Sequence, residues 1–206
     1  MRQAISSLNP LSRSFYAREP TYVAKSLIGK YLLRKLRDGT ELGGVIVETE
    51  AYGGHKDPAS HAYKGRTRRN EVMFGEAGHA YVYFTYGFHH CLNFVTGKKG
   101  IASAVLIRAL EPVSGIQIMQ KFRGKAELTD LASGPGKLCQ ALNIDRALNG
   151  CDITNSKSPI RVIDRNLRIP RIRRSIRIGI RTGTERKWRF FAESSRYVSK
   201  FPKSRE

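Results

Sequence analysis

Residues 31–52 read YLLRKLRDGTELGGVIVETEAY, and this stretch decides the class of fold. Residues 31–35 and 43–52 are rich in aromatic, leucine and β-branched side chains, a composition typical of strands. Between them lies Asp38-Gly39, a dipeptide typical of the tight turn in a β-hairpin. The stretch therefore predicts two neighbouring antiparallel strands.

Strand-like composition recurs further along the chain, in residues 79–86, 90–96, 103–110 and 188–192. Residues 175–181, SIRIGIR, alternate with a period of two, which predicts a strand with isoleucines on one face and arginines on the other. The polar, glycine-containing residues 53–80 predict a long irregular loop. A loop of that length in a compact domain is usually functional or mobile.

Helices are predicted at residues 20–29 and 112–122, and a further helix opens at Pro135 with Ser133 as its N-cap. Because strands dominate and the hairpins favour antiparallel pairing, we assign the chain to the α+β class. No internal repeat or low-complexity linker divides the sequence, so we expect one compact domain. It would span residues 1–206, with residues 1–15 as a flexible arm and residues 200–206 as a flexible tail.

The chain carries a large positive charge, with 37 Lys and Arg against 17 Asp and Glu among its 206 residues and a formal net charge of +20. This surplus favours a polyanionic partner, in the first place a nucleic acid. An anionic membrane surface is the weaker alternative, because no long basic amphipathic helix is evident. No stretch is apolar enough to span a bilayer, and the first residues lack the apolar centre of a secretory signal.

The cysteines, Cys91, Cys139 and Cys151, are scattered and odd in number. They form neither a disulfide framework nor a paired metal-binding knuckle. We therefore expect buried or idle thiols in a reducing, intracellular compartment.

Residues 47–52, VETEAY, contain the first candidates for catalysis. On a strand, Glu48, Glu50 and Tyr52 share one face while Thr49 takes the other. A carboxylate that meets arginines there could serve as a general base. On pattern alone, a solvated or salt-bridged strand face fits these residues at least as well.

Residues 81–86, YVYFTY, predict a strand on which Tyr81 and Tyr83 point one way and Tyr86 points the other. Residues 86–89 then resemble the tip of a hairpin. Exposed rings at a tip are unfavourable unless something covers them, and such side chains can wedge between DNA base steps. The alternative is that the tip folds back and its rings belong to the core.

His61 lies in the irregular loop, either as a polar residue that reads a base or as an ordinary surface histidine. The spacing does not favour a metal site, because two candidate sets lack the paired ligands of zinc: His55-Asp57-His61 and His89-His90-Cys91. Basic residues gather in three groups, which favours contact with nucleic-acid phosphates: residues 64–69, Gly136-Lys137 at a helix N-terminus, and residues 165–181.

Together these motifs resemble the alkyladenine DNA glycosylase family, also called 3-methyladenine or methylpurine DNA glycosylases. In chain order they are VETEAY (47–52), His61, RTRRN (66–70), YVYFTYG (81–87), CLN (91–93), LIRALEP (106–112) and SGPGKLCQAL (133–142). Each motif alone is weak, whereas the ordered set is specific and covers most of the chain. The resemblance implies a compact α+β domain with a central curved antiparallel sheet, surrounding helices and a protruding β-hairpin that inserts into DNA.

The resemblance also implies a monofunctional glycosylase without metal or other cofactor. Such an enzyme flips an alkylated or deaminated purine out of duplex DNA and hydrolyses its N-glycosidic bond. By motif position, Glu50 would activate the water, Arg108 would help to hold it, and Tyr52 and Tyr83 would stack on the base. Further contacts would come from His61, from Asn93, which disfavours guanine's exocyclic amine, and from the main-chain carbonyl of Ile178.

The resemblance implies DNA contacts as well. Tyr86 would fill the gap that the flipped base leaves in the duplex. Other contacts would come from Arg66, Arg69, Met73, Phe88 and Lys137. The sequence departs from the family pattern in two places, since the loop after Ile180 is short and the hairpin tip is rich in histidine. These departures concern the pocket wall and the geometry of insertion.

Two other functions stay open on the sequence. A basic module whose aromatic rings stack on single-stranded nucleic acid would explain the net charge without catalysis. A metal-dependent nuclease would use Glu48, Glu50 and Asp57. For the glycosylase we expect a monomer whose partner is double-stranded DNA with damaged purines, and no membrane partner. We expect it in the cytoplasm at a bacterial nucleoid, or in the nucleus if the source is a eukaryote.

Overall fold

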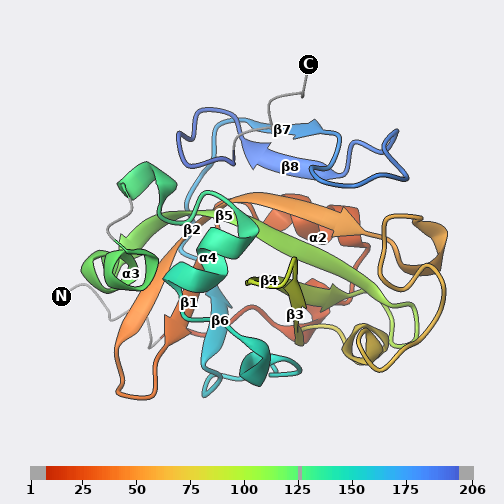
Figure 1. The fold of residues 1–206 in the computed structure, drawn as a ribbon, viewed down its shortest axis with the longest axis horizontal. Coiled ribbons are helices and arrows are strands. Elements are labelled where there is room, and N and C mark those ends of the chain that lie inside the picture. Colours follow the sequence, from red (N-terminus) through yellow and green to blue (C-terminus); the bar gives the residue numbers. More distant parts are fainter. Residues whose placement is uncertain (1–7, 125–126, 200–206) are drawn as a thin grey trace.

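The computed structural model describes residues 8–124 and 127–199, whose strands form one curled antiparallel sheet (Figure 1). The strands lie in the order β3-β4-β5-β2-β1-β6, while β8 pairs with β2 and β7 with β8. All the paired strands are antiparallel, which confirms the α+β class. Their bounds are β1 Tyr31–Lys35, β2 Glu41–Tyr52, β3 Ala80–Thr85, β4 His89–Thr96, β5 Ser103–Ser114, β6 Ile160–Ile163, β7 Ile172–Ser175 and β8 Arg189–Ala192.

The hairpin predicted around Asp38-Gly39 is present. β1 and β2 pair over residues 31–35 and 41–45, so β2 begins at Glu41 rather than at the predicted position 43. Gly44 is needed in this strand because a Cβ there would lie 2.3 Å from the carbonyl oxygen of Glu111 in β5. β2 and β5 therefore approach closely and form the centre of the sheet.

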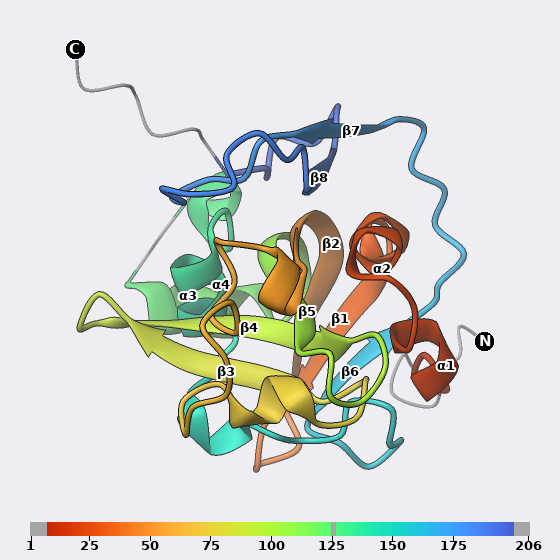
Figure 2. The ribbon, with the colours of Figure 1, turned by 90° about the vertical axis from the view of Figure 1, so that its right-hand side faces the viewer.

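Helices cover both sides of these central strands (Figure 2). α2, Pro20–Leu27, packs on β2 and β5 from one side, and α4, Pro135–Ala141, packs on β4 and β5 from the other. α1, Arg13–Tyr16, contacts β4, and α3, Ile116–Arg123, contacts α4. Short 3-10 turns lie at Gly54–Lys56, Glu71–Phe74, Leu128–Asp130 and Arg146–Leu148. The main apolar core fills the space between sheet and helices, with fully buried side chains such as Leu27, Leu32, Ile46, Val105 and Leu138.

Two predictions about helix starts are wrong. Pro112 lies within β5, and α3 begins only after Gly115, whose φ of 71° turns the chain out of the strand. Ser133 does not cap α4, because Gly134 occupies the N-cap position. The Ser133 hydroxyl donates to Asp130 Oδ1 at 3.4 Å instead.

The predicted strand at residues 175–181 is also wrong. β7 ends at Ser175, and the chain is irregular after it. Arg177 is 3% exposed and Ile176 is 45% exposed, so here the arginine lies inside the protein. The cause is an ion pair that places the Arg177 guanidinium inside the protein, 2.5 Å from Asp57 Oδ2.

The predicted N-terminal arm folds onto the domain from residue 8 onward. Leu8, Leu11 and Phe15 pack against the core. Arg13 Nη2 donates to Asp152 Oδ2 at 2.6 Å. Residues 8–15 are therefore not a flexible arm, because their apolar side chains are partly buried. Residues 1–7 and the predicted tail, residues 200–206, lie outside the described residues.

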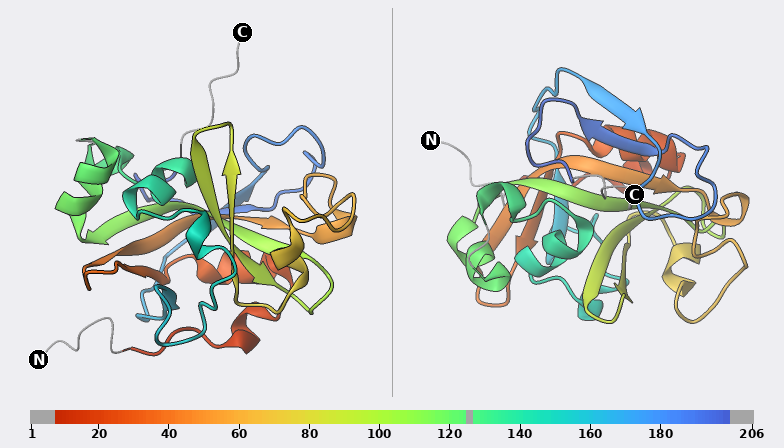
Figure 3. Two further views of the ribbon diagram at one scale, coloured as in Figure 1. Left: turned by 60° about the horizontal axis from the view of Figure 1, so that its bottom comes forward. Right: turned by 45° about the horizontal axis from the view of Figure 1, so that its top comes forward.

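β3 and β4 form a hairpin that projects from the body of the protein (Figure 3). Its strands pair from Ala80 opposite Phe94 to Thr85 opposite His89. Since β4 also pairs with β5, the base of the hairpin is fixed to the central sheet while its tip extends beyond it.

Candidate active site

The two glutamates of β2 lie on one face of the sheet, and the threonine between them lies on the other. Thr49 Oγ1 donates to the carbonyl of Ala24 in α2 at 2.9 Å. Glu48 and Glu50 are both 0% exposed, and both contact Arg108 of β5. The predicted alternation is confirmed, and the face that carries the acids is buried and ion-paired rather than solvated.

Glu50 accepts contacts from three residues that line a single cavity. Tyr52 Oη donates to Glu50 Oε2 at 2.8 Å, and Arg108 Nη1 lies 3.3 Å from the same oxygen. The main-chain N–H of Ile178 donates to Oε1 at 2.7 Å, whereas the sequence assigned a role to the Ile178 carbonyl. The carboxylate therefore lies directly behind the cavity wall, held by charge-assisted hydrogen bonds.

Arg108 joins the two glutamates. Its Nε donates to Glu48 Oε1 at 3.1 Å. Burial acts to lower the pKa of Arg108, but the charges of Glu50 and Glu48 outweigh this effect and raise the pKa above its usual value. The guanidinium therefore stays charged beside the cavity.

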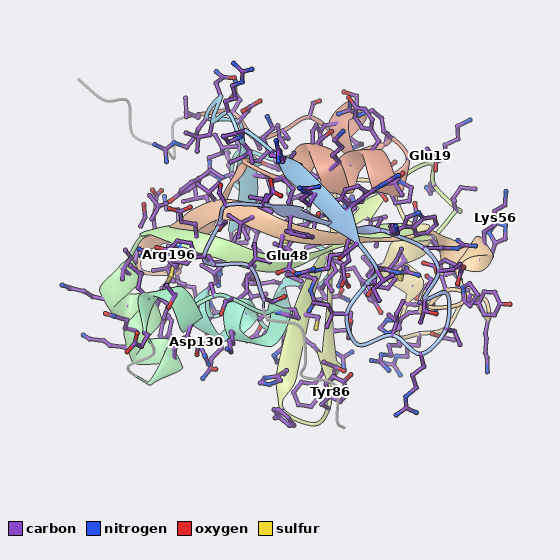
Figure 4. All side chains as sticks on the ribbon, turned by 90° about the horizontal axis from the view of Figure 1, so that it is seen from above. Glu19, Glu48, Lys56, Tyr86, Asp130 and Arg196 are labelled. Carbon is purple, nitrogen blue, oxygen red and sulfur yellow. The ribbon has the colours of Figure 1, made fainter. Side chains whose placement is uncertain are left out.

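Glu48, which Figure 4 shows in the interior, has further partners that the sequence did not reveal. Arg189 Nε donates to Oε1 at 2.6 Å, and Ser199 donates to the carboxylate from its N–H at 2.6 Å and its hydroxyl at 2.7 Å. Arg189 belongs to β8, and Ser199 lies beyond it. These two residues hold Glu48, which in turn accepts from Arg108.

A cavity of about 410 Å³ opens beside these residues, within the size range of small-molecule sites. Three parts of the chain form its walls: the loop after β2, the β3–β4 hairpin with β5, and the segment after β7. The structure brings the predicted residues together here, because the cavity is lined by Tyr52, His61, Tyr83, Asn93, Arg108 and Ile178.

Aromatic rings make one wall of the cavity. The His61 ring meets Tyr83 edge-on with 4.5 Å between centroids, and His61 Nδ1 lies 3.0 Å from the Tyr81 hydroxyl. Burial raises the pKa of Tyr81 to about 12, and burial raises that of Tyr83 still further. Burial and the charge of Arg69 lower the pKa of His61. The wall therefore presents neutral rings at neutral pH.

Tyr52 closes the cavity on the β2 side. One face of its ring lies against Arg177, whose guanidinium carbon is 4.8 Å from the ring centroid. Burial, followed by the charge of Glu50, raises the pKa of Tyr52 well above its usual value. Tyr52 is thus a neutral phenol that donates to Glu50.

Asn93 and Cys91 lie at the inner end of the cavity on β4. Asn93 is 4% exposed, and its Nδ2 donates to the carbonyl of Tyr81 at 3.2 Å. Burial raises the pKa of the Cys91 thiol, so Cys91 lines the cavity as a neutral thiol. Cys91 and Cys139 are buried and Cys151 is partly buried, all as free cysteines, which agrees with the expectation from sequence.

The hairpin tip is exposed rather than part of the core. Tyr86 is 78% and Phe88 is 69% exposed, and Figure 4 shows Tyr86 at the far end of the hairpin. The prediction that Tyr83 and Tyr86 occupy opposite strand faces is wrong. Tyr86 lies outside β3 with a φ of 54°, and this left-handed turn directs it to the rim of the same cavity as Tyr83.

The residues predicted to contact DNA differ in their exposure and in their partners. Arg66 and Arg69 are exposed, and Arg69 Nη2 donates to the carbonyl of Phe84 in the hairpin at 3.2 Å. Lys137 is partly exposed and pairs with Asp130. Met73, which is also predicted to lie along the DNA, is only 2% exposed and packs beneath the loop with Tyr81. It lines the cavity.

Asp57, which the sequence offered only as a metal or nuclease ligand, has another role. Arg177 donates to it through two nitrogens, Nη1 at 2.5 Å and Nη2 at 2.8 Å. Across residues 8–124 and 127–199, no three His, Cys, Asp or Glu side chains gather as they would around a metal ion. In the same described part, the helices are all too short or too polar to cross a membrane.

Comparisons with known proteins agree with this geometry. The family model described as methylpurine-DNA glycosylase matches residues 14–196. A protein of Carboxydothermus hydrogenoformans is 52% identical over 190 residues, which cover 92% of this chain and 98% of the relative. A protein of Methanocella arvoryzae is 48% identical over 194 residues, which cover 92% and 96%. Both relatives carry the name 3-methyladenine DNA glycosylase.

Proposed function

Because the chain belongs to the methylpurine-DNA glycosylase family, we propose that it flips a damaged purine into the cavity and cleaves its glycosidic bond with a water activated by Glu50. Family and relatives make it a DNA-repair hydrolase of N-glycosyl bonds, a 3-methyladenine DNA glycosylase that acts on DNA. This assignment contradicts a binding module without catalysis. A nuclease site is not favoured either, because Glu48 and Asp57 are both paired with arginines.

One observation carries the proposal: the buried carboxylate of Glu50 lies behind a cavity walled by aromatic rings. Glu50 is oriented by Tyr52, Arg108 and Ile178, and each of these residues also lines the cavity. A carboxylate has about four acceptor positions. A water can therefore bind Glu50 beside the Tyr52 hydroxyl and face a sugar placed at the cavity mouth.

The chemistry suits an alkylated purine. A purine alkylated at N3 or N7 is positively charged and is already a good leaving group, so the enzyme need not protonate it. The electron-rich faces of Tyr52 and Tyr83 attract a cationic base by about 1 kcal/mol or more once water is excluded. The ionised Glu50 offsets the positive charge that develops on the sugar as the C1′–N bond breaks and the base leaves as a neutral purine. Glu50 then takes the proton of the water as the water oxygen bonds to C1′, while Arg108 fixes the carboxylate.

Selectivity and DNA contacts follow from the same arrangement. In this proposal Asn93 disfavours the exocyclic amine of guanine and His61 offers a polar contact to the base, since both residues line the cavity. Tyr86, at the exposed tip of the hairpin, fills the gap that the flipped base leaves in the duplex. Phe88 contacts the DNA next to it. Flipping costs a few kcal/mol and costs least where the base pair is already weakened, which adds selectivity for damage. The phosphates are contacted by Arg66, Arg69 and Lys137.

Deaminated purines such as hypoxanthine belong to the proposed substrates too. We propose that the enzyme acts as a monomer in the cytoplasm, at a bacterial nucleoid. The net charge of +20 would hold it on DNA without a second subunit.

The test compares the wild-type protein with Glu50→Gln. Both are incubated in EDTA with alkylated and with inosine-containing duplexes, and the released free bases are identified. The wild type should release alkylated purines and leave an intact backbone until alkali is added. Glu50→Gln should abolish release while binding lesion DNA nearly normally. Release at the wild-type rate by this variant would refute the role of Glu50.

A further inference from the structure

The buried pair of Asp57 and Arg177 joins three separate parts of the chain beside the cavity. Arg177 donates to both Asp57 oxygens, to the carbonyl of Ala51 at the end of β2 at 3.0 Å, and to the carbonyl of Gly183 at 3.2 Å. Asp57 also accepts the main-chain N–H of Gly53 at 3.1 Å. One guanidinium thus holds together the end of β2, the loop that follows it and the segment after β7.

The surroundings of the pair are tightly fitted. The Arg177 guanidinium lies between two rings, 4.8 Å from the centroid of Tyr52 and 5.3 Å from that of Trp188. A Cβ at Gly183 would lie 3.1 Å from Arg177 Nη2 and 3.3 Å from Asp57 Oδ1, and Gly183 has a φ of 63°. The short loop after Ile180 therefore has a glycine, Gly183, where its main chain packs against the ion pair of Asp57 and Arg177.

Stability alone does not account for this pair. Both side chains are 0% exposed, and desolvation of two charges often cancels their attraction. Within the described residues, Arg177 Nε is buried without a hydrogen-bond partner, which is itself unfavourable. A buried ion pair with such a cost, next to the proposed catalytic carboxylate, points to a role in function.

The link to catalysis is direct along the chain and through space. Ile178 follows Arg177, and its N–H is the donor to Glu50 Oε1 at 2.7 Å. Tyr52, whose ring lies against Arg177, is the donor to Glu50 Oε2 at 2.8 Å. Arg177 therefore holds both the ring on one side of Glu50 and the main chain on the other.

We propose that Asp57 and Arg177 are positioning residues, which fix Tyr52 and the Ile178 N–H against Glu50 and so determine the state of the catalytic carboxylate. The inference rests on the proposed role of Glu50. Hydrogen bonds to an ionised carboxylate favour that form. When the pair is broken, the Ile178 N–H moves away, and the ionised form of Glu50 loses a hydrogen bond that favours it.

The experiment measures single-turnover base release from dimethyl sulfate-treated duplex DNA, with full-length protein in excess, from pH 5 to pH 8. Asp57→Asn keeps the size of the side chain and removes its charge. We expect release at pH 7 to slow by about tenfold to a hundredfold, as for a small displacement of catalytic groups. We also expect the acidic limb of the pH–rate profile to move upward by about half to one pH unit, with little change in affinity for DNA.

The matched control is Asp152→Asn, which breaks the ion pair with Arg13, 2.6 Å long, on a part of the protein that does not line the cavity. It removes the same charge from an Asp–Arg pair that is about one-third exposed, so it reports the effect of the lost charge away from the cavity. Its acidic limb should coincide with that of the wild type. Thermal unfolding of each variant measures the loss of stability separately. Arg177→Lys keeps the charge but cannot reach all four acceptor oxygens, and it should show an intermediate shift if Asp57→Asn fails to fold.

The outcomes distinguish the positioning role of Asp57 and Arg177 from the proposed role of Glu50. If Asp57→Asn or Arg177→Lys, measured per folded molecule, has the rate and the pH limb of the Asp152→Asn control, the positioning role is refuted. If Glu50→Gln is inactive in that same series, the proposed function stands while this inference fails. If Glu50→Gln is fully active, the proposed function fails as well.

Discussion

Replacing Glu48 with glutamine should destabilise the protein strongly, although the side chain hardly changes in size. Glu48 accepts from Arg108, Arg189 and Ser199 with both oxygens while 0% exposed. A glutamine keeps one acceptor oxygen, turns an NH₂ group toward a donor, and removes the buried negative charge that Arg108 and Arg189 both contact. Removal of one partner of a buried ion pair costs about 3–5 kcal/mol.

The assay is thermal unfolding followed by circular dichroism at pH 7. In a protein of this length each kcal/mol lowers Tm by about 2–4 °C, so the expected loss is about 6–20 °C. Glu193→Gln is the matched control, because Glu193 pairs with Arg173 at 2.6 Å on the exposed edge of the sheet. This control should leave Tm almost unchanged. Equal Tm values for the two variants would refute the view that the ion pairs of Glu48 stabilise the protein strongly because they are buried.

Further predictions concern the hairpin, the DNA contacts and acid stability. Tyr86→Ala should weaken binding to lesion-containing duplex by about tenfold, the loss of one stacked ring, and weaken non-specific binding less. Fluorescence anisotropy measures both, and an equal loss on both would contradict insertion. Arg66→Ala should flatten the log–log dependence of DNA affinity on salt by about 0.9 if the side chain contacts a phosphate; an unchanged slope would rule out that contact. Burial acts to raise the pKa of Asp57, but the bonds from Arg177 outweigh it and lower that pKa. Its stabilisation is full above the unfolded-state pKa of about 3.9 and is lost as the pH falls through the lower folded value. Asp57→Asn should therefore lose stability at pH 7 and show a flatter decline below about pH 4 in urea titrations; a decline as steep as in the wild type would argue against the shift.

Local patterns predicted a large part of the fold and of the site. The alternation of Glu48, Thr49 and Glu50 was correct because successive side chains on a strand point to opposite faces, whatever lies around them. The turn at Asp38-Gly39 was correct because its backbone preference is local. The ordered motifs indicated which residues would meet, and the structure places Tyr52, His61 and Tyr83 around one cavity.

The errors came where a distant partner decided the local conformation. Residues 175–181 have the pattern of a strand, yet Arg177 lies inside because Asp57, 120 residues earlier in the chain, provides its counter-charge. The main chain then departs from the strand, and the Ile178 N–H, rather than its carbonyl, meets Glu50. The burial of Met73 was not evident from the sequence for a similar reason, because it depends on packing against Tyr81.

The sequence by itself determined the strand periodicity, the turns, the net charge and the family, since each depends on neighbouring residues or on motifs in order. Only the tertiary structure decided which charges are buried, which donors hold Glu50, and that Tyr86 and Tyr83 share one cavity. The physical reason is that burial of a charge is tolerated only where its partner lies, and partners such as Asp57 and Arg177 are brought together by the fold alone.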